Sequence, residues 1–266
     1  MIVGELSASG TGVVATPYEA AERNEIGYTA TYCPTLTIQI GKATESTDDV
    51  ITVNGAVITS WEISGKVGEL ITYSCDFQAR TAISSTTVTA YTAPSDDPFN
   101  FVEATAYLNG ATRTATVLKC QSFNVKGANE FAFSNELSTR VPVQPVLKSR
   151  KYDFTLEVLM TTDATATVLD AQELRAKILS STNTFSNSPT PTECGDLNIL
   201  ISEGAANADK VMSIELENCY FDSISEPIDI GNGTCTMTIN GFALQGSTDG
   251  SVATDFVPFR WYAVLV

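Results

Sequence analysis

The ten residues KYDFTLEVLM, Lys151 to Met160, are the stretch that shows the fold class most directly. Every second position is apolar, namely Tyr152, Phe154, Leu156, Val158 and Met160. Most of the positions between them are polar, namely Lys151, Asp153, Thr155 and Glu157. Successive side chains of a strand point to opposite faces of a sheet. This alternation therefore predicts a strand with one face in a hydrophobic core and the other in water.

Other parts of the chain repeat this pattern. Residues 57–64 and 71–79 alternate in the same way, and the turn Gly65 to Gly68 between them predicts a hairpin. Further strands are expected over 117–125, 212–221 and 234–244. We therefore expect a mainly β fold, either a β-sandwich or a β-barrel.

One or two α-helices are expected beside the strands. Thr16, Pro17 and Glu19 have the spacing of a capping box, which predicts a helix from Tyr18 to about Ile26. An amphipathic pattern predicts a second helix near Leu169 to Ser180.

The length of 266 residues fits one large all-β domain, and no internal repeat divides it. We expect a single domain over 1–266 with three special segments. These are an N-terminal arm with a short helix over 1–30, a loop or insertion over 182–210, and a C-terminal segment over 256–266.

The charged residues exclude several functions. The chain has no histidine, and 31 Asp and Glu against 15 Lys and Arg give a formal net charge of −16. A Ser-His-Asp or Cys-His catalytic arrangement is therefore excluded, and a basic surface that grips nucleic acid is not expected. No pair of carboxylates has a spacing that supports glycosidase chemistry. We expect no enzymatic activity and no cofactor.

Metal sites and disulfides are not predicted either. The six cysteines form no C-x-x-C pair, so we expect buried free thiols. The acidic pairs Asp48-Asp49 and Asp96-Asp97 lack the spacing of a calcium loop. Residues 1–12 show no secretory signal, and the apolar tract 256–266 is too short to span a bilayer, so we expect a soluble, non-secreted protein.

The order of three blocks resembles the tail tube proteins of tailed viruses of bacteria and archaea. The first block is Ala56 to Ala82, a strand, a Gly-containing turn and a second strand. The second, Leu118 to Thr161, ends in a Pro-flanked segment and the strand KSRKYDFTLEV. The third, Ile214 to Leu244, contains NCYFDSISEPIDIGNGTCTMTINGFAL. Together the blocks cover most of the chain from about residue 30.

The resemblance implies a structural virion protein in the viral tail, assembled in the host cytoplasm. Six copies would close into a ring, and the rings would stack into a tube around the tape measure protein. Tail terminator and baseplate proteins would be further partners. The resemblance does not decide between a tube with a surrounding sheath and one without. Viral DNA would pass through the tube without specific binding, and no membrane would be involved.

If the subunit forms such a ring, the polar faces of its strands could line the lumen. The expected lumen-facing residues are Glu62, Thr72, Ser74, Asp76, Gln78, Asp153, Thr155 and Glu157. Over the three strands that supply them, four carboxylates against Lys151 give a charge of −3 per subunit. Such a lining would let DNA slide, whereas a cationic lining would hold it.

The C-terminal aromatic residues Phe259, Trp261 and Tyr262 are candidates for contact between rings, because aromatic anchors are common at interface centres. An alternative is that this segment is the last strand of the core. Two other classes of protein also remain open. One is a cell-surface or extracellular β-sandwich binding module, such as an adhesin domain, with six paired cysteines, and the other is a carboxylate-based hydrolase.

Overall fold

The computed structural model describes residues 6–9, 18–22, 35–42, 49–85, 98–109, 117–134, 137, 144–160, 168–169, 174, 193–202, 211–225, 235–244 and 259–264. Its strands are β1 (Leu6–Ser9), β2 (Tyr18–Glu22), β3 (Leu36–Lys42), β4 (Asp49–Lys66), β5 (Thr72–Gln78), β6 (Thr81–Ser85), β7 (Ala104–Asn109), β8 (Val117–Leu118), β9 (Cys120–Ser134), β10 (Gln144–Leu159), β11 (Val168–Leu169), β12 (Glu193–Ser202), β13 (Val211–Ser225), β14 (Thr236–Ala243) and β15 (Phe259–Val264). A 3₁₀ turn, Phe101–Glu103, precedes β7.

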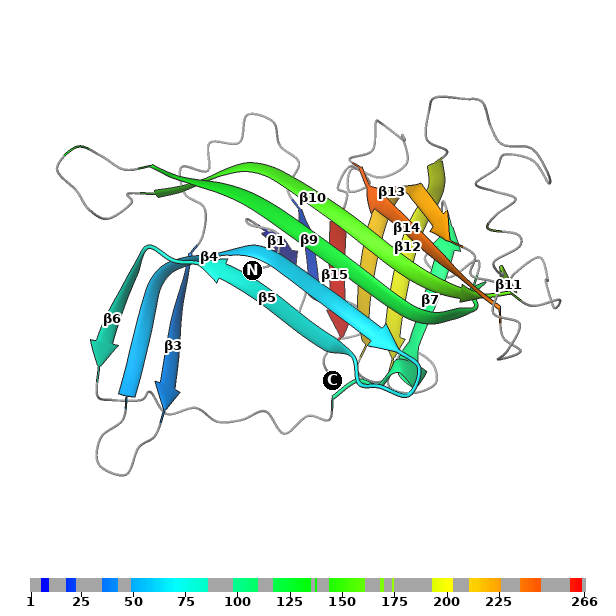
Figure 1. Cartoon of the computed structure of the whole chain (residues 1–266), viewed down its shortest axis with the longest axis horizontal. Coiled ribbons are helices and arrows are strands. Elements are labelled where there is room, and N and C mark those ends of the chain that lie inside the picture. The colour runs from blue at the N-terminus through cyan, green and yellow to red at the C-terminus, as the bar shows by residue number, and fades with distance from the viewer. Residues whose placement is uncertain are drawn as a thin grey trace.

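Two layers of strands make up the body of the molecule (Figure 1). The first layer is antiparallel throughout, in the order β5-β4-β9-β10-β14-β13. The second runs β8-β7-β12-β13-β15-β2-β1, with the short β11 beside β8. Strand β13 belongs to both layers, because residues 211–216 pair with β12 and β15 whereas residues 219–225 pair with β14. The fold is therefore mainly β, as predicted.

The hydrophobic core lies between the two layers. Trp61 of β4 and Tyr152 of β10 both contact Phe259 of β15, with ring centroids 5.0 and 5.3 Å apart. Phe154, Leu156 and Val158 of β10 are fully buried, in the alternation that the sequence predicts. Burial of such large side chains supplies most of the driving force for folding.

A three-stranded extension projects from this body (Figure 1). We call it the arm; it is a different part of the chain from the N-terminal arm predicted over 1–30. It consists of β3, residues 49–54 of β4, and β6, with β4 in the middle. Strand β4 passes from the arm into the body at Gly55, whose φ of +67° is a conformation that favours glycine. Ile40, Ile51 and Ile83 of the arm are 53, 43 and 57% exposed.

The strands predicted from alternation are confirmed. Residues 57–64 lie in β4 and form the expected hairpin with β5. The strand predicted over 151–160 lies in β10, and those over 212–221 and 234–244 correspond to β13 and β14.

The helix predicted over 18–26 is wrong, because Tyr18–Glu22 form strand β2. This strand pairs with β1 on one side and with β15 on the other. Two ladders of backbone hydrogen bonds outweigh the weak local preference of a capping sequence. Most of the second predicted helix lies outside the described residues, although Leu174 has helical backbone and is fully buried.

The loop predicted over 182–210 is also wrong for residues 193–202, which form β12. This strand lies between β7 and β13 in the second layer. Leu197, Ile199 and Ile201 alternate along it and are all buried. The flanking proline-rich segment obscured this alternation in the sequence.

Candidate functional site

The outer surface of the first layer is mostly polar, and we call its polar residues the polar face. Ala128, Tyr220 and Phe242 lie on the same side, and the rings of Tyr220 and Phe242 stack with their centroids 5.9 Å apart. The members of the polar face point away from the core, alternate with buried residues, and face one another across five antiparallel pairs. They are Ser60, Glu62, Ser64, Lys66, Thr72, Ser74, Asp76, Ser122, Asn124, Lys126, Lys151, Asp153, Thr155, Glu157, Ser223, Ser225, Thr238 and Asn240.

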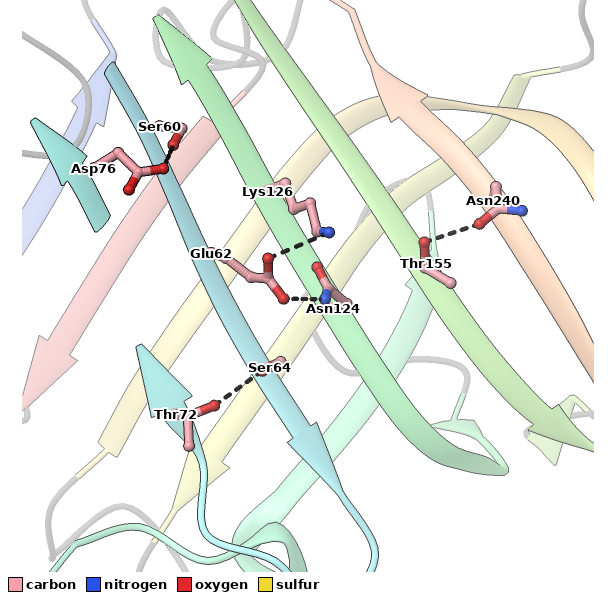
Figure 2. Close-up of polar contacts among 9 residues, drawn as sticks. All are labelled: Ser60, Glu62, Ser64, Thr72, Asp76, Asn124, Lys126, Thr155 and Asn240. Atoms are coloured by element: carbon pink, nitrogen blue, oxygen red, sulfur yellow. Dashed lines mark hydrogen bonds and ion pairs between the residues drawn. The ribbon is translucent and has the colours of Figure 1, made fainter. Parts of the chain in front are cut away.

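Hydrogen bonds between neighbouring strands cross this face (Figure 2). The hydroxyl of Ser60 donates to the carboxylate of Asp76 at 2.7 Å. The hydroxyls of Ser64 and Thr72 are 3.0 Å apart, and either can donate. Between β10 and β14, the Thr155 hydroxyl donates to the side-chain carbonyl of Asn240 at 2.9 Å. These polar groups are therefore satisfied within the subunit.

Glu62 lies at the centre of the face and links β4 to β9. Its carboxylate accepts a hydrogen bond from the side-chain amide of Asn124 and lies 3.2 Å from the ammonium of Lys126. On β10, the ammonium of Lys151 lies 2.9 Å from the carboxylate of Asp153. Glu157 accepts a hydrogen bond from Ser122 at 3.0 Å. Each of the four carboxylates of the polar face thus has a partner.

The net charge of this face is smaller than the sequence suggests. The sequence count of −3 considers only the residues of β4, β5 and β10. Register places Lys126 of β9 opposite both Glu62 and Asp153, and places Lys66 opposite Ser122. With four carboxylates and three lysines, the polar-face residues of β5, β4, β9 and β10 carry a formal charge of −1. The exposed Asp222, at the bulge of β13 beside Ser223, adds one more negative charge at the edge of this layer.

The eight residues predicted to face a lumen lie on the strands of the first layer. Seven of them, all except Gln78, belong to the polar face. Gln78 continues the alternation of β5 but lies opposite the buried Val57, because the β4–β5 register shifts between Ile58 and Ser60. The structure therefore brings together the residues that the sequence predicts, whereas their place in a tube stays a prediction.

Sequence reasoning missed the contribution of β9 to this face. Ser122, Asn124 and Lys126 alternate with the buried Phe123, Val125 and Gly127. The predicted strand over 117–125 ended too early, and the same alternation test extended by a few residues would have included Lys126.

The structure gives different information on the three C-terminal aromatic residues that the sequence singles out. Phe259 is fully buried in the core of its own subunit, in contact with Trp61 and Tyr152, so the structure corrects its predicted contact between rings. Trp261 and Tyr262 lie on β15, paired with β13 and β2. Contact between rings through these two residues stays a prediction.

Four cysteines within the described residues have free thiols. Cys219 is buried and Cys120 and Cys235 are partly buried, whereas Cys75 is exposed. Burial raises the pKa of the Cys120 thiol to about 12. None of these four thiols forms a disulfide within the described part of the chain, which does not favour the six paired cysteines of a cell-surface module.

The described ranges contain no group of three or more His, Cys, Asp or Glu residues that could hold a metal ion. The acidic residues Glu45, Asp48, Asp96 and Asp97 lie outside these ranges. Among the same residues, no helix has the length and apolar character needed to cross a membrane.

Two packed layers of one continuous sheet, with a mostly polar outer face, define the chain as a mainly β protein. A family model described as "Phage tail tube protein" matches residues 3–218. The chain belongs to this family and is a structural component of a phage tail. The resemblance to this family is thereby confirmed; the match covers the first two sequence blocks and ends within the third.

Sixteen chains among the solved structures match this chain. One of them is "Cryo-EM structure of the anti-feeding prophage cap (AFP tube terminating cap)", at 16% sequence identity and a TM-score of 0.40. The match covers 59% of this chain and 93% of that one. No curated protein matches the chain.

Proposed function

We propose that the chain is the tail tube subunit, that copies of it close into hexameric rings, and that stacked rings form the conduit for viral DNA ejection. The polar face of the first layer lines the channel in this proposal. The observation that supports it is the continuity of that face across β5, β4, β9, β10 and β14, with most of its groups already paired.

The electrostatics of the polar face suit passage of DNA better than binding. Duplex DNA presents one negative charge per about 1.7 Å of its axis, and proteins hold it mainly through unpaired Lys and Arg. Lys126 and Lys151 each lie close to a carboxylate, at 3.2 and 2.9 Å. A phosphate would have to compete with that carboxylate, so the attraction at each point is weak. A nearly neutral, hydroxyl-rich wall therefore offers DNA little to hold it.

The proposal also assigns partners and a place of assembly. The tape measure protein occupies the channel before the DNA, and terminator and baseplate proteins contact the two ends of the tube. The subunits assemble in the host cytoplasm and function in the virion tail.

The first experiment is cryo-electron microscopy of the assembled tail. We expect density for Asp76 and Asp153 at the channel wall. A reconstruction that placed these two carboxylates on the outer surface of the tube would contradict the proposed lumen.

The second experiment changes the charge of the wall. Asp76→Lys makes the polar face more positive by two charges per subunit, and we expect slower DNA release whose rate rises again with salt concentration. Asp49→Lys makes the same charge change on the exposed arm and serves as the matched control. Equal release rates for the two variants would contradict a DNA-lining role for the polar face.

A further inference from the structure

Asparagine followed by glycine is a chemically reactive pair, and the chain contains four such pairs. Two of them lie wholly within the described residues, Asn54-Gly55 in β4 and Asn240-Gly241 in β14. In this reaction the backbone nitrogen of the glycine attacks the side-chain carbonyl carbon of the asparagine. Glycine leaves that nitrogen unshielded, because it has no Cβ. The surrounding structure then decides which pair can react.

Asn240 is held by both neighbouring strands. Its side-chain carbonyl accepts a hydrogen bond from Thr155 at 2.9 Å (Figure 2), and its side-chain amide donates to Ser223 at 3.1 Å. Gly241 is buried, and it is paired with β10 on one side and with β13 on the other. An attack on Asn240 therefore requires rotation of a side chain that is bonded at both ends and of a backbone that is paired on both sides.

Asn54 and Gly55 lie where β4 passes from the arm into the body, and we call this pair the joint. On the side of β3 the register shifts, so Thr37 alone faces both residues of the joint. On the other side, the pairs with β6 end at Asn54, and those with β5 begin at Val57. Among the described residues, Gly55 therefore has no register partner of its own.

This interruption makes local opening easier at Asn54 than at Asn240. The attack requires rotation about the Cα–C bond of Asn54 away from the extended conformation, and hydrogen bonds between strands resist that rotation. Segments with fewer such bonds open at a lower free energy than the paired core of a sheet. Both residues of the joint are also partly exposed, so water can reach them.

The fold itself requires a glycine at the joint. Gly55 has a φ of +67°, and a Cβ at this position would lie 2.9 Å from the Cβ of Arg80. Backbone conformation and packing therefore both demand a residue without a side chain. The passage of β4 from the arm into the body thus places an unshielded backbone nitrogen directly after Asn54.

We propose that Asn54 is a site of spontaneous deamidation, with water as the only co-reactant. The Gly55 nitrogen bonds to Cγ of Asn54, the Cγ–Nδ2 bond breaks, and Nδ2 leaves as ammonia with the proton of the Gly55 nitrogen. Water then opens the succinimide ring at one of its two carbonyl groups. One opening gives aspartate at position 54, and the other gives isoaspartate, whose main chain is longer by one methylene group. This inference goes beyond the proposed function and does not depend on it.

The joint can accommodate this longer main chain. On the side of β5 and β6, the pairs before and after the joint belong to different strands, so an extra atom between residues 54 and 55 shifts neither set. On the side of β3, only the pair of Leu36 with Ala56 lies beyond the joint. In β14 the same change would displace pairs with two strands at once. We therefore expect the modified chain to remain folded, with the arm redirected relative to the body.

Peptide mass spectrometry of the full chain after incubation at mildly alkaline pH tests the proposal. Electron-transfer fragmentation distinguishes asparagine, aspartate and isoaspartate at each position. We expect Asn54 to convert at least about tenfold faster than Asn240 in the folded chain. Equal rates, or a faster conversion at Asn240, would overturn the proposal.

The same incubation in concentrated urea is the control for the structural cause. Without the fold, the two pairs differ only in their sequence neighbours, so the two rates should become similar. A difference of the same size in urea would overturn the proposal, because the protection of Asn240 would then not come from its strands and hydrogen bonds.

The substitution Asn54→Gln tests the assignment to this residue. Its longer side chain would have to form a six-membered ring, so we expect the conversion at position 54 to disappear while that at Asn240 stays unchanged. The tryptic peptide over 43–66 contains no other asparagine and no glutamine, so its deamidation reports on this position alone. Conversion of this peptide at the wild-type rate in the variant would overturn the assignment.

The modified chain itself can be isolated, because replacement of an amide by a carboxylate adds a negative charge that ion-exchange chromatography resolves. We expect this species to show the same cooperative thermal unfolding as the unmodified chain. An unfolded species would overturn the accommodation of isoaspartate at the joint.

Discussion

Gly127 of β9 lies opposite Trp61 of β4, and the indole ring fills the space that any side chain at position 127 would need. Trp61 is 2% exposed and contacts Phe259 of the second layer. The absence of a side chain on β9 thus allows the largest residue of the core to span the two layers.

Gly127→Ala should therefore destabilise the subunit. The added methyl group has to displace the indole or the backbone, and overpacking of this kind costs about 1–3 kcal/mol. The free energy of urea unfolding measures the loss. Ala128→Ser, at the exposed neighbouring position, should change it by less than about 0.5 kcal/mol. Equal unfolding midpoints for the two variants would show that the core can absorb the methyl group.

Phe259→Ala should lower the stability of the isolated subunit before any assembly takes place. Phe259 is fully buried between Trp61 and Tyr152, and removal of a buried aromatic ring costs about 3–5 kcal/mol. Thermal unfolding of the subunit gives the measurement, and Phe259→Leu should cost clearly less. A variant with normal stability that failed only in assembly would instead support a contact between rings.

The ion pair between Glu62 and Lys126 should contribute little to stability. Their side chains are 36 and 54% exposed, and pairs at this exposure typically contribute less than about 1 kcal/mol. A double-mutant cycle with Glu62→Gln and Lys126→Met isolates the coupling. The amide oxygen introduced by Glu62→Gln can still accept the hydrogen bond from Asn124, so the cycle removes mainly the charge term. A coupling above about 2 kcal/mol would contradict this expectation.

The stability of the subunit should fall at alkaline pH. Burial raises the pKa of the Cys120 thiol from its usual 9.0 to about 12, so the folded state favours the neutral thiol. This contribution is complete below pH 9.0 and is lost as the pH rises toward 12. The loss is at most about 1.4 kcal/mol per pH unit.

Urea unfolding at about pH 8 and about pH 10.5 compares the wild type with Cys120→Ala, because these values lie on either side of the point at which an exposed thiol ionises. The variant should lose less stability between these two pH values. Some dependence should remain, because burial also raises the pKa of Tyr73 to about 12. Identical pH profiles for the two proteins would mean that Cys120 titrates normally in the folded state.

The polar face was largely predictable from the sequence because alternation in a strand records which side is wet. Glu62, Asp153 and Thr155 lie where this rule places them. Lys126 lies just beyond the strand predicted over 117–125, because β9 continues to Ser134. The rule failed for one side of β5. Alternation indicates that Tyr73, Cys75 and Phe77 form an apolar side, but it does not indicate whether residues of the same chain bury that side.

Pairing between distant segments could not be predicted. The capping pattern before Tyr18 is a local signal, whereas the strand that forms there depends on β15, more than 230 residues later. Likewise, β13 passes from one layer to the other at Asn218, whose φ is +49°, but an Asn in the sequence does not by itself indicate such a passage. Such properties arise from tertiary contacts, which a single sequence does not record.

Strand β4 has a mechanical consequence for the subunit. It runs unbroken for 18 residues from Asp49 in the arm to Lys66 in the body. Gly55 bends the strand without interrupting it, and the backbone N–H of Arg80 donates to the carbonyl of Asn54 at the same point. A loop in this place would absorb a pull on the arm. A pull on the arm would here reach Trp61 and Glu62 directly, along the continuous backbone of β4.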